Sequence, residues 1–178
     1  MEHKVIKDFL PEMELKALEH IVFGNKFHWF FCRRLNENQA DHDSDFFFHR
    51  VIFVDERTSL RDAPPKPSYE YFKAPAFSLF ESLIKRLKIK TLLRIHVNLF
   101  VKTPTLVHHT PHKYQIPKCR GAIFSLNTCD GMTRLENKIC VPSVRNQMLL
   151  FNPSKLHNST STTNKPRRLN INFNWYDD

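Results

Sequence analysis

The sequence predicts an α+β protein in which two N-terminal helices support a β-sandwich or β-barrel. Three observations lead to this prediction: two helix-like segments precede residue 90, strand-like segments dominate after it, and two of these strands carry a polar face. Helices on one side of a mainly antiparallel β-core are typical of this fold class. At 178 residues, we expect one domain over residues 1–178, with residues 1–90 supporting a β-core in 91–178.

The first segments alternate between strand and helix. Residues 4–9 form a short strand-like run, and Pro11 stands where a helix begins. The spacing of three and four residues then predicts one apolar helix face, formed by Leu15, Leu18 and Val22.

Two aromatic and β-branched runs come next, over residues 27–33 and 46–54, and both are typical of strands. The polar, acidic stretch 36–45 between them indicates a loop, and the proline-rich stretch 63–67 indicates a stiff connector. A second helix is expected afterwards, with a buried side formed by Phe77, Phe80, Ile84 and Leu87.

Strands dominate the second half of the chain. Residues 93–101 alternate almost strictly, with apolar residues at odd positions and a second face formed by Arg94, His96, Asn98 and Phe100. The last strand repeats this pattern, with a polar face formed by Arg168, Asn170, Asn172 and Asn174. Residues 121–126 and 147–151 predict further short strands.

Two interpretations of these polar faces stay open. The faces can simply meet solvent, as the outer face of an antiparallel sheet commonly does. Asparagine, however, is a poor strand former, and solvent faces usually favour other residues. The alternative is a polar pocket inside the sandwich, with the apolar outer faces covered by the helices.

The charge is concentrated in the second half. The chain has 27 Lys and Arg against 18 Asp and Glu, and a formal net charge of +9. Residues 1–90 carry a net charge of +1 and residues 91–178 one of +8. This excess reflects either solubility or an anionic ligand handled by that half.

Composition also bears on location. No apolar run approaches the roughly 18 residues of a membrane-spanning helix, and the charged start lacks the core of a secretory signal. The four cysteines fit no zinc-binding spacing and are expected to be free thiols. We therefore expect a cytoplasmic protein without membrane contact.

Histidines and one arginine are the candidates for chemistry. Three histidines lie in residues 107–114, where Pro111 disfavours helix, and His157 follows a turn 45 residues after His112. These histidines can be surface residues, metal ligands or phosphate contacts. Arg168 opens the polar face of the last strand, either as a surface residue or as a bidentate partner for a carboxylate.

Several segments, in their order and spacing, resemble the non-haem iron(II)/2-oxoglutarate-dependent dioxygenases, and most closely the small prolyl-4-hydroxylase-like members carried by phages. The resemblance spans most of the chain, including its N-terminal stretch. The segments that carry it are Leu93–Phe100, His112–Tyr114, Asn127–Thr133, Asn146 to Phe151, His157, and Arg168 to Asn174.

The resemblance implies a double-stranded β-helix, or jelly roll, with N-terminal helices packed on one sheet. It further implies a hydroxylase that uses Fe(II), 2-oxoglutarate and O₂, with a substrate such as a protein side chain, proline included. His112 and His157 match the two histidine ligands of iron, and Arg168 matches the residue that binds the distal carboxylate of 2-oxoglutarate. Asn98 and Asn127 match strands that line the pocket, where either can bind the co-substrate.

The third iron ligand departs from the family pattern. Two histidines and one carboxylate hold Fe(II) in such enzymes, but Tyr114 stands where the acid is expected. Four outcomes stay open: a phenolate ligand from Tyr114, a water or chloride, a distant acid, or loss of iron. The distant acids to consider are Asp41, Asp43 and Asp45.

Two rival functions follow from these features. A catalytically inactive jelly roll would bind nucleic acid or a phage protein, consistent with the missing carboxylate and the basic second half. An oxygenase that acts on nucleobases would instead need aromatic residues for stacking near the pocket. Both differ from the leading prediction, a phage-type hydroxylase acting in the cytoplasm of an infected host.

Overall fold

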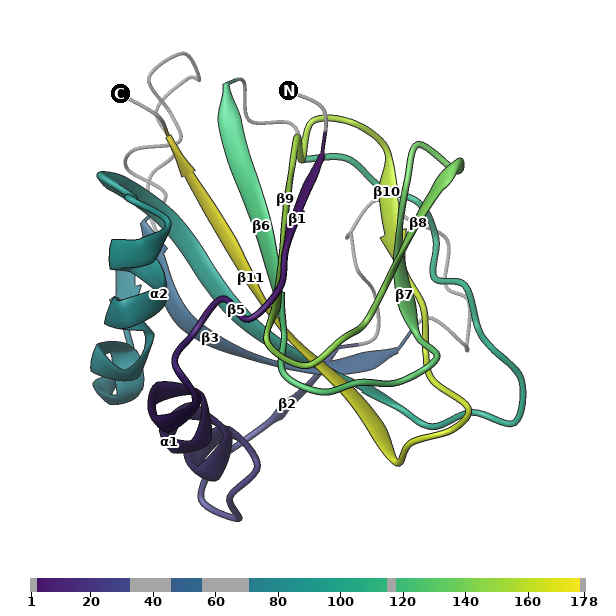
Figure 1. Cartoon of the computed structure of the whole chain (residues 1–178), viewed down its shortest axis with the longest axis horizontal. Coiled ribbons are helices and arrows are strands. Elements are labelled where there is room, and N and C mark those ends of the chain that lie inside the picture. Colours follow the sequence, from purple (N-terminus) through teal and green to yellow (C-terminus); the bar gives the residue numbers. More distant parts are fainter. Residues whose placement is uncertain (1–2, 33–45, 56–70, 115–117, 177–178) are drawn as a thin grey trace.

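Two β-sheets and a short helical layer make up the fold (Figure 1). The computed structural model describes residues 3–32, 46–55, 71–114 and 118–176. The helices are α1 (Glu12–Val22), the 3₁₀ helix η2 (Pro75–Phe80) and α2 (Glu81–Arg86). The strands are β1 (Lys4–Ile6), β2 (Phe30–Cys32), β3 (Phe47–Asp55), β4 (Tyr71–Lys73), β5 (Thr91–Val101), β6 (Cys119–Ser125), β7 (Met132–Leu135), β8 (Ile139–Pro142), β9 (Gln147–Phe151), β10 (His157–Ser159) and β11 (Arg167–Tyr176).

The larger sheet is antiparallel, with the order β1-β9-β6-β11-β5-β3-β2, and β4 also pairs with β3. The last strand of the chain, β11, lies in its middle and pairs with β5 on one side and β6 on the other. The register sets Arg168 opposite Phe100, Asn170 opposite Asn98, and Asn174 opposite Arg94. Because side chains alternate along strands, the two polar faces predicted for β5 and β11 form one continuous polar face.

The smaller sheet has the order β10-β7-β8. The extended segment 107–112 lies beside β10 through isolated bridges that join His108 to Thr160 and His112 to His157. This segment therefore extends the smaller sheet, and the bridge brings the two candidate iron ligands side by side.

The helices and the smaller sheet lie on opposite sides of the larger sheet, as Figure 1 shows. Leu15, Leu18 and Val22 of α1 share one hydrophobic cluster with Ile95 of β5 and Ile171 of β11. A second, smaller cluster joins the two sheets; its members are Ile123, Leu135, Val141, Leu149 and Phe151. The apolar face of β5 and β11 is thus buried under the helices, and their polar face points toward the smaller sheet.

The predicted α+β composition, a mainly antiparallel sheet with two short helices, is confirmed. The helix predicted around residue 80 begins as η2 and continues as α2. This change of helix type puts Leu83 at the core, whereas Phe77, Ile84 and Leu87 pack at its margin. The stretches 36–45 and 63–67 lie outside the described residues. Within the described ranges, no helix is long and apolar enough to cross a membrane.

Candidate active site

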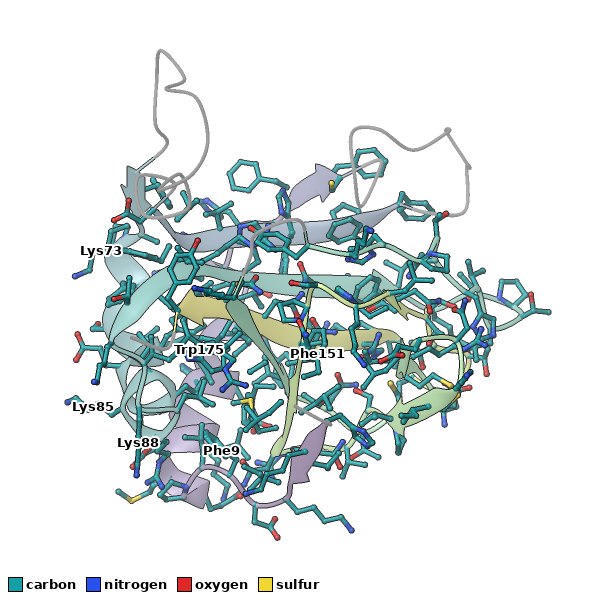
Figure 2. All side chains as sticks on the ribbon, turned by 90° about the horizontal axis from the view of Figure 1, so that it is seen from above. Phe9, Lys73, Lys85, Lys88, Phe151 and Trp175 are labelled. Atoms are coloured by element: carbon teal, nitrogen blue, oxygen red, sulfur yellow. The ribbon has the colours of Figure 1, made fainter. Side chains whose placement is uncertain are left out.

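His112 and His157 lie side by side at the edge of the polar face. The backbone amide of His112 donates to the carbonyl of His157 at 2.9 Å, and the reverse bond measures 2.8 Å. This antiparallel bridge sets the imidazole centroids 4.4 Å apart. The ring centroid of Phe151 lies 4.9 Å from that of His157. Figure 2 shows Phe151 in the interior, whereas the labelled lysines Lys73, Lys85 and Lys88 point outward. The structure thus brings together the two histidines that the sequence separates by 45 residues.

Both imidazoles are neutral at neutral pH. Burial lowers the pKa of His157 to about 4, and His112 and Arg94 act in the same direction. Burial also lowers the pKa of His112. The Nδ1 atom of His157 lies 2.9 Å from the carbonyl oxygen of Lys155, and because a carbonyl only accepts, Nδ1 carries the proton. The lone pair on Nε2 of His157 is therefore open to a ligand.

The low pKa of His157 makes the stability of the protein depend on pH. Unfolded histidine titrates near 6.5, whereas folded His157 stays neutral down to about pH 4. Between these values the unfolded state binds more protons, so the free energy of unfolding is expected to fall as pH is lowered from about 6.5 to about 4. Urea denaturation of wild type and His157→Gln across this range measures the effect. In the variant, the free energy of unfolding should depend less steeply on pH. Identical pH dependences of the two proteins would contradict the low pKa of His157.

Tyr114 and Arg94 lie beside the histidine pair. The guanidinium carbon of Arg94 stands 4.3 Å from the centre of the Tyr114 ring. Arg94 also donates to Oδ1 of Asn174, from Nε at 3.3 Å and from Nη2 at 3.1 Å. A cation stacked on an aromatic ring is a favourable contact, and it places the positive charge of Arg94 beside the residue that follows His112 by two positions.

A complete metal-binding group is missing from the part of the chain that the structure describes. No three histidine, cysteine, aspartate or glutamate side chains there are grouped closely enough to hold a metal ion. Asp41, Asp43 and Asp45, which the sequence leaves as possible ligands, lie outside the described residues. Around the His112–His157 pair, the described residues therefore supply two imidazoles as possible metal ligands and no carboxylate.

Arg168 is a buried cation, with only 1% of the residue exposed. Its guanidinium donates from Nη1 to the carbonyl of Thr160 at 3.1 Å and from Nη2 to Oγ1 of Thr133 at 3.0 Å. Its Nε makes no hydrogen bond within the described residues, and none of their carboxylates pairs with the guanidinium. Burial lowers the pKa of Arg168 to about 10, so it stays protonated at neutral pH.

Gly131 provides the space that Arg168 needs. A Cβ atom added there would lie 2.5 Å from the carbonyl oxygen of Ser161 and 2.6 Å from Cδ of Arg168. Both distances are shorter than real Cβ atoms show, so a side chain at position 131 would displace the Ser161 backbone and the Arg168 side chain. The absence of a side chain at Gly131 therefore leaves the space through which the Arg168 side chain reaches Thr133 and Thr160.

Buried amides lie between Arg168 and Arg94 on the polar face. Nδ2 of Asn98 donates to Oδ1 of Asn170 at 3.1 Å. Nδ2 of Asn170 and Oδ1 of Asn172 are buried and find no partner in the described ranges. Because buried polar groups are normally hydrogen-bonded, these atoms and Nε of Arg168 indicate that a polar ligand or ordered water belongs here. A solvent-facing role for this face does not fit Asn98 and Asn170, which are almost completely buried.

Asn127 lies apart from this row, in the turn after β6. Its Nδ2 donates to the carbonyl of Arg167 at 2.9 Å, and its Oδ1 accepts from the amide of Leu169 at 2.8 Å. The side chain thus grips the backbone on either side of Arg168. Its geometry supports positioning of β11, whereas Asn98 has the place in the polar row that the sequence predicts for both.

Sequence reasoning did not single out Thr133, Thr160 and Asn174 as site residues. Thr133 and Thr160 bind the Arg168 guanidinium, and Asn174 binds that of Arg94. The alternation of β11 already placed Asn174 on the polar face. Alternation gives no comparable signal for the two threonines, because they lie on short or irregular segments of the smaller sheet.

Comparison by sequence finds no match, either among family models or among curated proteins. Comparison by structure finds many solved chains, among them a member of the 2OG-Fe(II) oxygenase family, prolyl hydroxylases and a non-heme alpha ketoglutarate dependent epimerase. One is an oxidoreductase of the 2OG-Fe(II) oxygenase family from Burkholderia pseudomallei, with a TM-score of 0.66, 9% identity, and coverage of 99% of this chain and 86% of that one.

Two others are prolyl hydroxylases. A prolyl-4-hydroxylase from Pseudomonas putida has a TM-score of 0.62 and 11% identity, with 99% of this chain and 92% of that one covered. A prolyl hydroxylase from Trichoplax adhaerens, in complex with a hypoxia inducible factor peptide fragment, has a TM-score of 0.63 and 15% identity, with coverages of 98% and 83%. At these identities the likenesses establish the fold, which the chain shares over nearly its whole length.

Proposed function

We propose that this chain is an iron(II)- and 2-oxoglutarate-dependent oxygenase or hydroxylase. The observation that carries the proposal is Arg168, a fully buried guanidinium without a carboxylate partner among the described residues. Burying an unpaired charge is costly, so its counterion is expected to come from a ligand. A carboxylate suits the bidentate geometry of arginine, and 2-oxoglutarate supplies one at its distal end.

The order of the strands supports a double-stranded β-helix formed by residues 1–178 as one domain. In this assignment β5, β11, β6 and β9 form one sheet, and the segment 107–112 with β10, β7 and β8 forms the facing sheet. The co-substrate then lies between the sheets. Its distal carboxylate binds Arg168 and Thr133, and Asn98 and its neighbours on β11 orient its other polar atoms.

The residues fit the two non-protein components unequally. The buried cation and the unpaired amides fit 2-oxoglutarate. Iron finds two neutral imidazoles, from His112 and His157, but the described residues do not complete its usual set with a carboxylate. Tyr114 follows His112 by two residues, where the acid of the usual ligand set is expected, and its ring lies under Arg94. Iron, when bound, would supply the activation of O₂.

A protein side chain such as proline is the favoured substrate. This preference is supported by the prolyl hydroxylases among the structures that share the fold, one of which holds a peptide. By resemblance to phage-carried members, we place the enzyme in the cytoplasm of an infected host.

The test is aerobic turnover of 2-oxoglutarate with added Fe(II), measured as succinate formed and O₂ consumed. We expect Fe(II)-dependent succinate formation by the wild-type chain and none by a His112→Ala, His157→Ala double variant that remains folded. Absence of turnover and of Fe(II) binding in the wild type, without rescue by Tyr114→Asp, would refute the proposal.

A second candidate function is that of a catalytically inactive jelly roll that binds nucleic acid. It is favoured by the absence of a complete metal-binding group in the described residues and by the net charge of +8 in residues 91–178. Binding that neutralises phosphates weakens steeply as salt is raised. Titration of a labelled oligonucleotide at several salt concentrations tests this function, and absent or salt-insensitive binding would exclude it.

A further inference from the structure

Arg94 is a second cation on the polar face without an acid. It is half-buried, and its guanidinium contacts the Tyr114 ring and the amide oxygen of Asn174. No carboxylate of the described residues forms an ion pair with it. A neutral amide and an aromatic ring compensate a full positive charge only in part, so the polar face carries an excess of positive charge at this point.

The charge of Arg94 acts on the whole group of histidines around it. Besides the histidine pair, it contributes to lowering the pKa of His49 and His96, for both of which burial is the larger cause. The rings of His49 and His96 lie 5.6 Å apart on β3 and β5. This surrounding therefore contains several neutral imidazoles and one cation, and the described residues place no anion in it.

Arg94 and Arg168 are distinct positions. Arg94 lies opposite Asn174 and Arg168 lies opposite Phe100, so six residues of β11 separate the two levels. At roughly 3.3 Å per residue, this is about 20 Å along the strand. Their side chains also have different partners, since Arg168 turns to Thr133 and Thr160 whereas Arg94 lies over Tyr114.

We propose that Arg94 forms a second anion-binding position next to the histidine pair, and that it takes a carboxylate or phosphate group of the molecule on which the protein acts. The guanidinium is held from one side by Asn174 and from one face by Tyr114, which pre-organises it for bidentate binding. An anion bound there offsets the charge of Arg94. It also brings a negative charge to a place where position 114, a tyrosine, provides no carboxylate. Only the assignment of this anion to the substrate rests on the proposed function.

The test is calorimetric titration of the metal-free full chain with inorganic phosphate and with acetate, in the presence of saturating 2-oxoglutarate. Wild type should bind at least one of these anions saturably. Arg94→Gln should weaken this binding by roughly tenfold or more, the usual effect of losing a hydrogen bond to a charged group. Arg134→Gln is the matched control, because Arg134 donates to the carbonyl of Asn137 at the surface, and it should bind like wild type.

The inference is overturned if wild type binds neither anion. It is also overturned if Arg94→Gln binds both anions as wild type does, while circular dichroism shows that each protein is folded. A third contrary result is that Arg94→Gln lowers the affinity for 2-oxoglutarate as strongly as Arg168→Gln does, which would make Arg94 part of the co-substrate site.

The source of the anion is tested with glycerol phosphate. It should bind more tightly than inorganic phosphate, and equal affinities would show that the anion does not come from an organic substrate. Because the titrations contain no iron and measure no turnover, their failure is independent of the turnover assay.

Discussion

Replacing Arg168 with glutamine is expected to weaken the binding of 2-oxoglutarate strongly. The guanidinium is the buried cation that the distal carboxylate would meet, and glutamine removes its charge and its fork of donors. Losing one partner of a buried, hydrogen-bonded charge pair costs about 2–5 kcal/mol. The dissociation constant should therefore rise by roughly thirtyfold to several thousandfold. Calorimetric titration with 2-oxoglutarate measures this change.

The neighbouring residue provides a control for the Arg168 experiment. Arg167 is exposed, and its guanidinium lies 5.1 Å from the centre of the Phe23 ring on the helix side of the sheet. Arg167→Gln removes the same charge one residue away and should leave 2-oxoglutarate binding unchanged. If Arg168→Gln is folded and binds as wild type does, the co-substrate site is not at Arg168.

Replacing Tyr114 with aspartate is expected to raise the affinity for Fe(II) strongly. The change puts a carboxylate two residues after His112 and completes two imidazoles with one anion, the set that suits Fe(II). The new carboxylate also meets the unpaired charge of Arg94, which now lies over the Tyr114 ring. Anaerobic titration with Fe(II) measures the affinity, and succinate formation measures the activity that follows.

Charge and size at position 114 are separated by a second variant. Tyr114→Asn has nearly the shape of Tyr114→Asp but carries no negative charge, so it should gain much less affinity for Fe(II). Equal affinities of the two variants would show that space, not charge, limits iron binding. If Tyr114→Asp leaves the affinity for Fe(II) unchanged, the result would contradict the proposal that His112 and His157 bind iron.

Local periodicity predicted most of the long elements. Residues 93–101 alternate so regularly that both faces of β5 could be assigned before its neighbours were known, and the same holds for β11. The apolar face of α1 follows from spacings of three and four residues in the same way. By contrast, β7, β8 and β10 have only four, four and three residues, too few for a periodic signal. Within their sheet β7 and β8 pair locally, whereas β10 and the segment 107–112 are joined to it by pairing between residues distant in sequence.

The site was predictable in its residue types and less so in its contacts. The sequence singled out His112, His157 and Arg168, and the structure places the two histidines in one bridge and buries the arginine. It could not show that Asn127 is engaged with the backbone of β11, because that contact spans 40 residues or more.

By itself, the sequence determined the α+β composition, the polar faces of two strands and the absence of an acid two residues after His112. These are local properties, set by side-chain alternation and by residue identity. Only the tertiary structure decided that this polar face is interior, and that Arg94 lies over Tyr114 beside the histidines. The reason is that antiparallel pairing of β5 with β11 joins residues about 80 positions apart, such as Arg94 and Asn174. Burial on the side facing the smaller sheet then leaves two cations without an acid among the described residues.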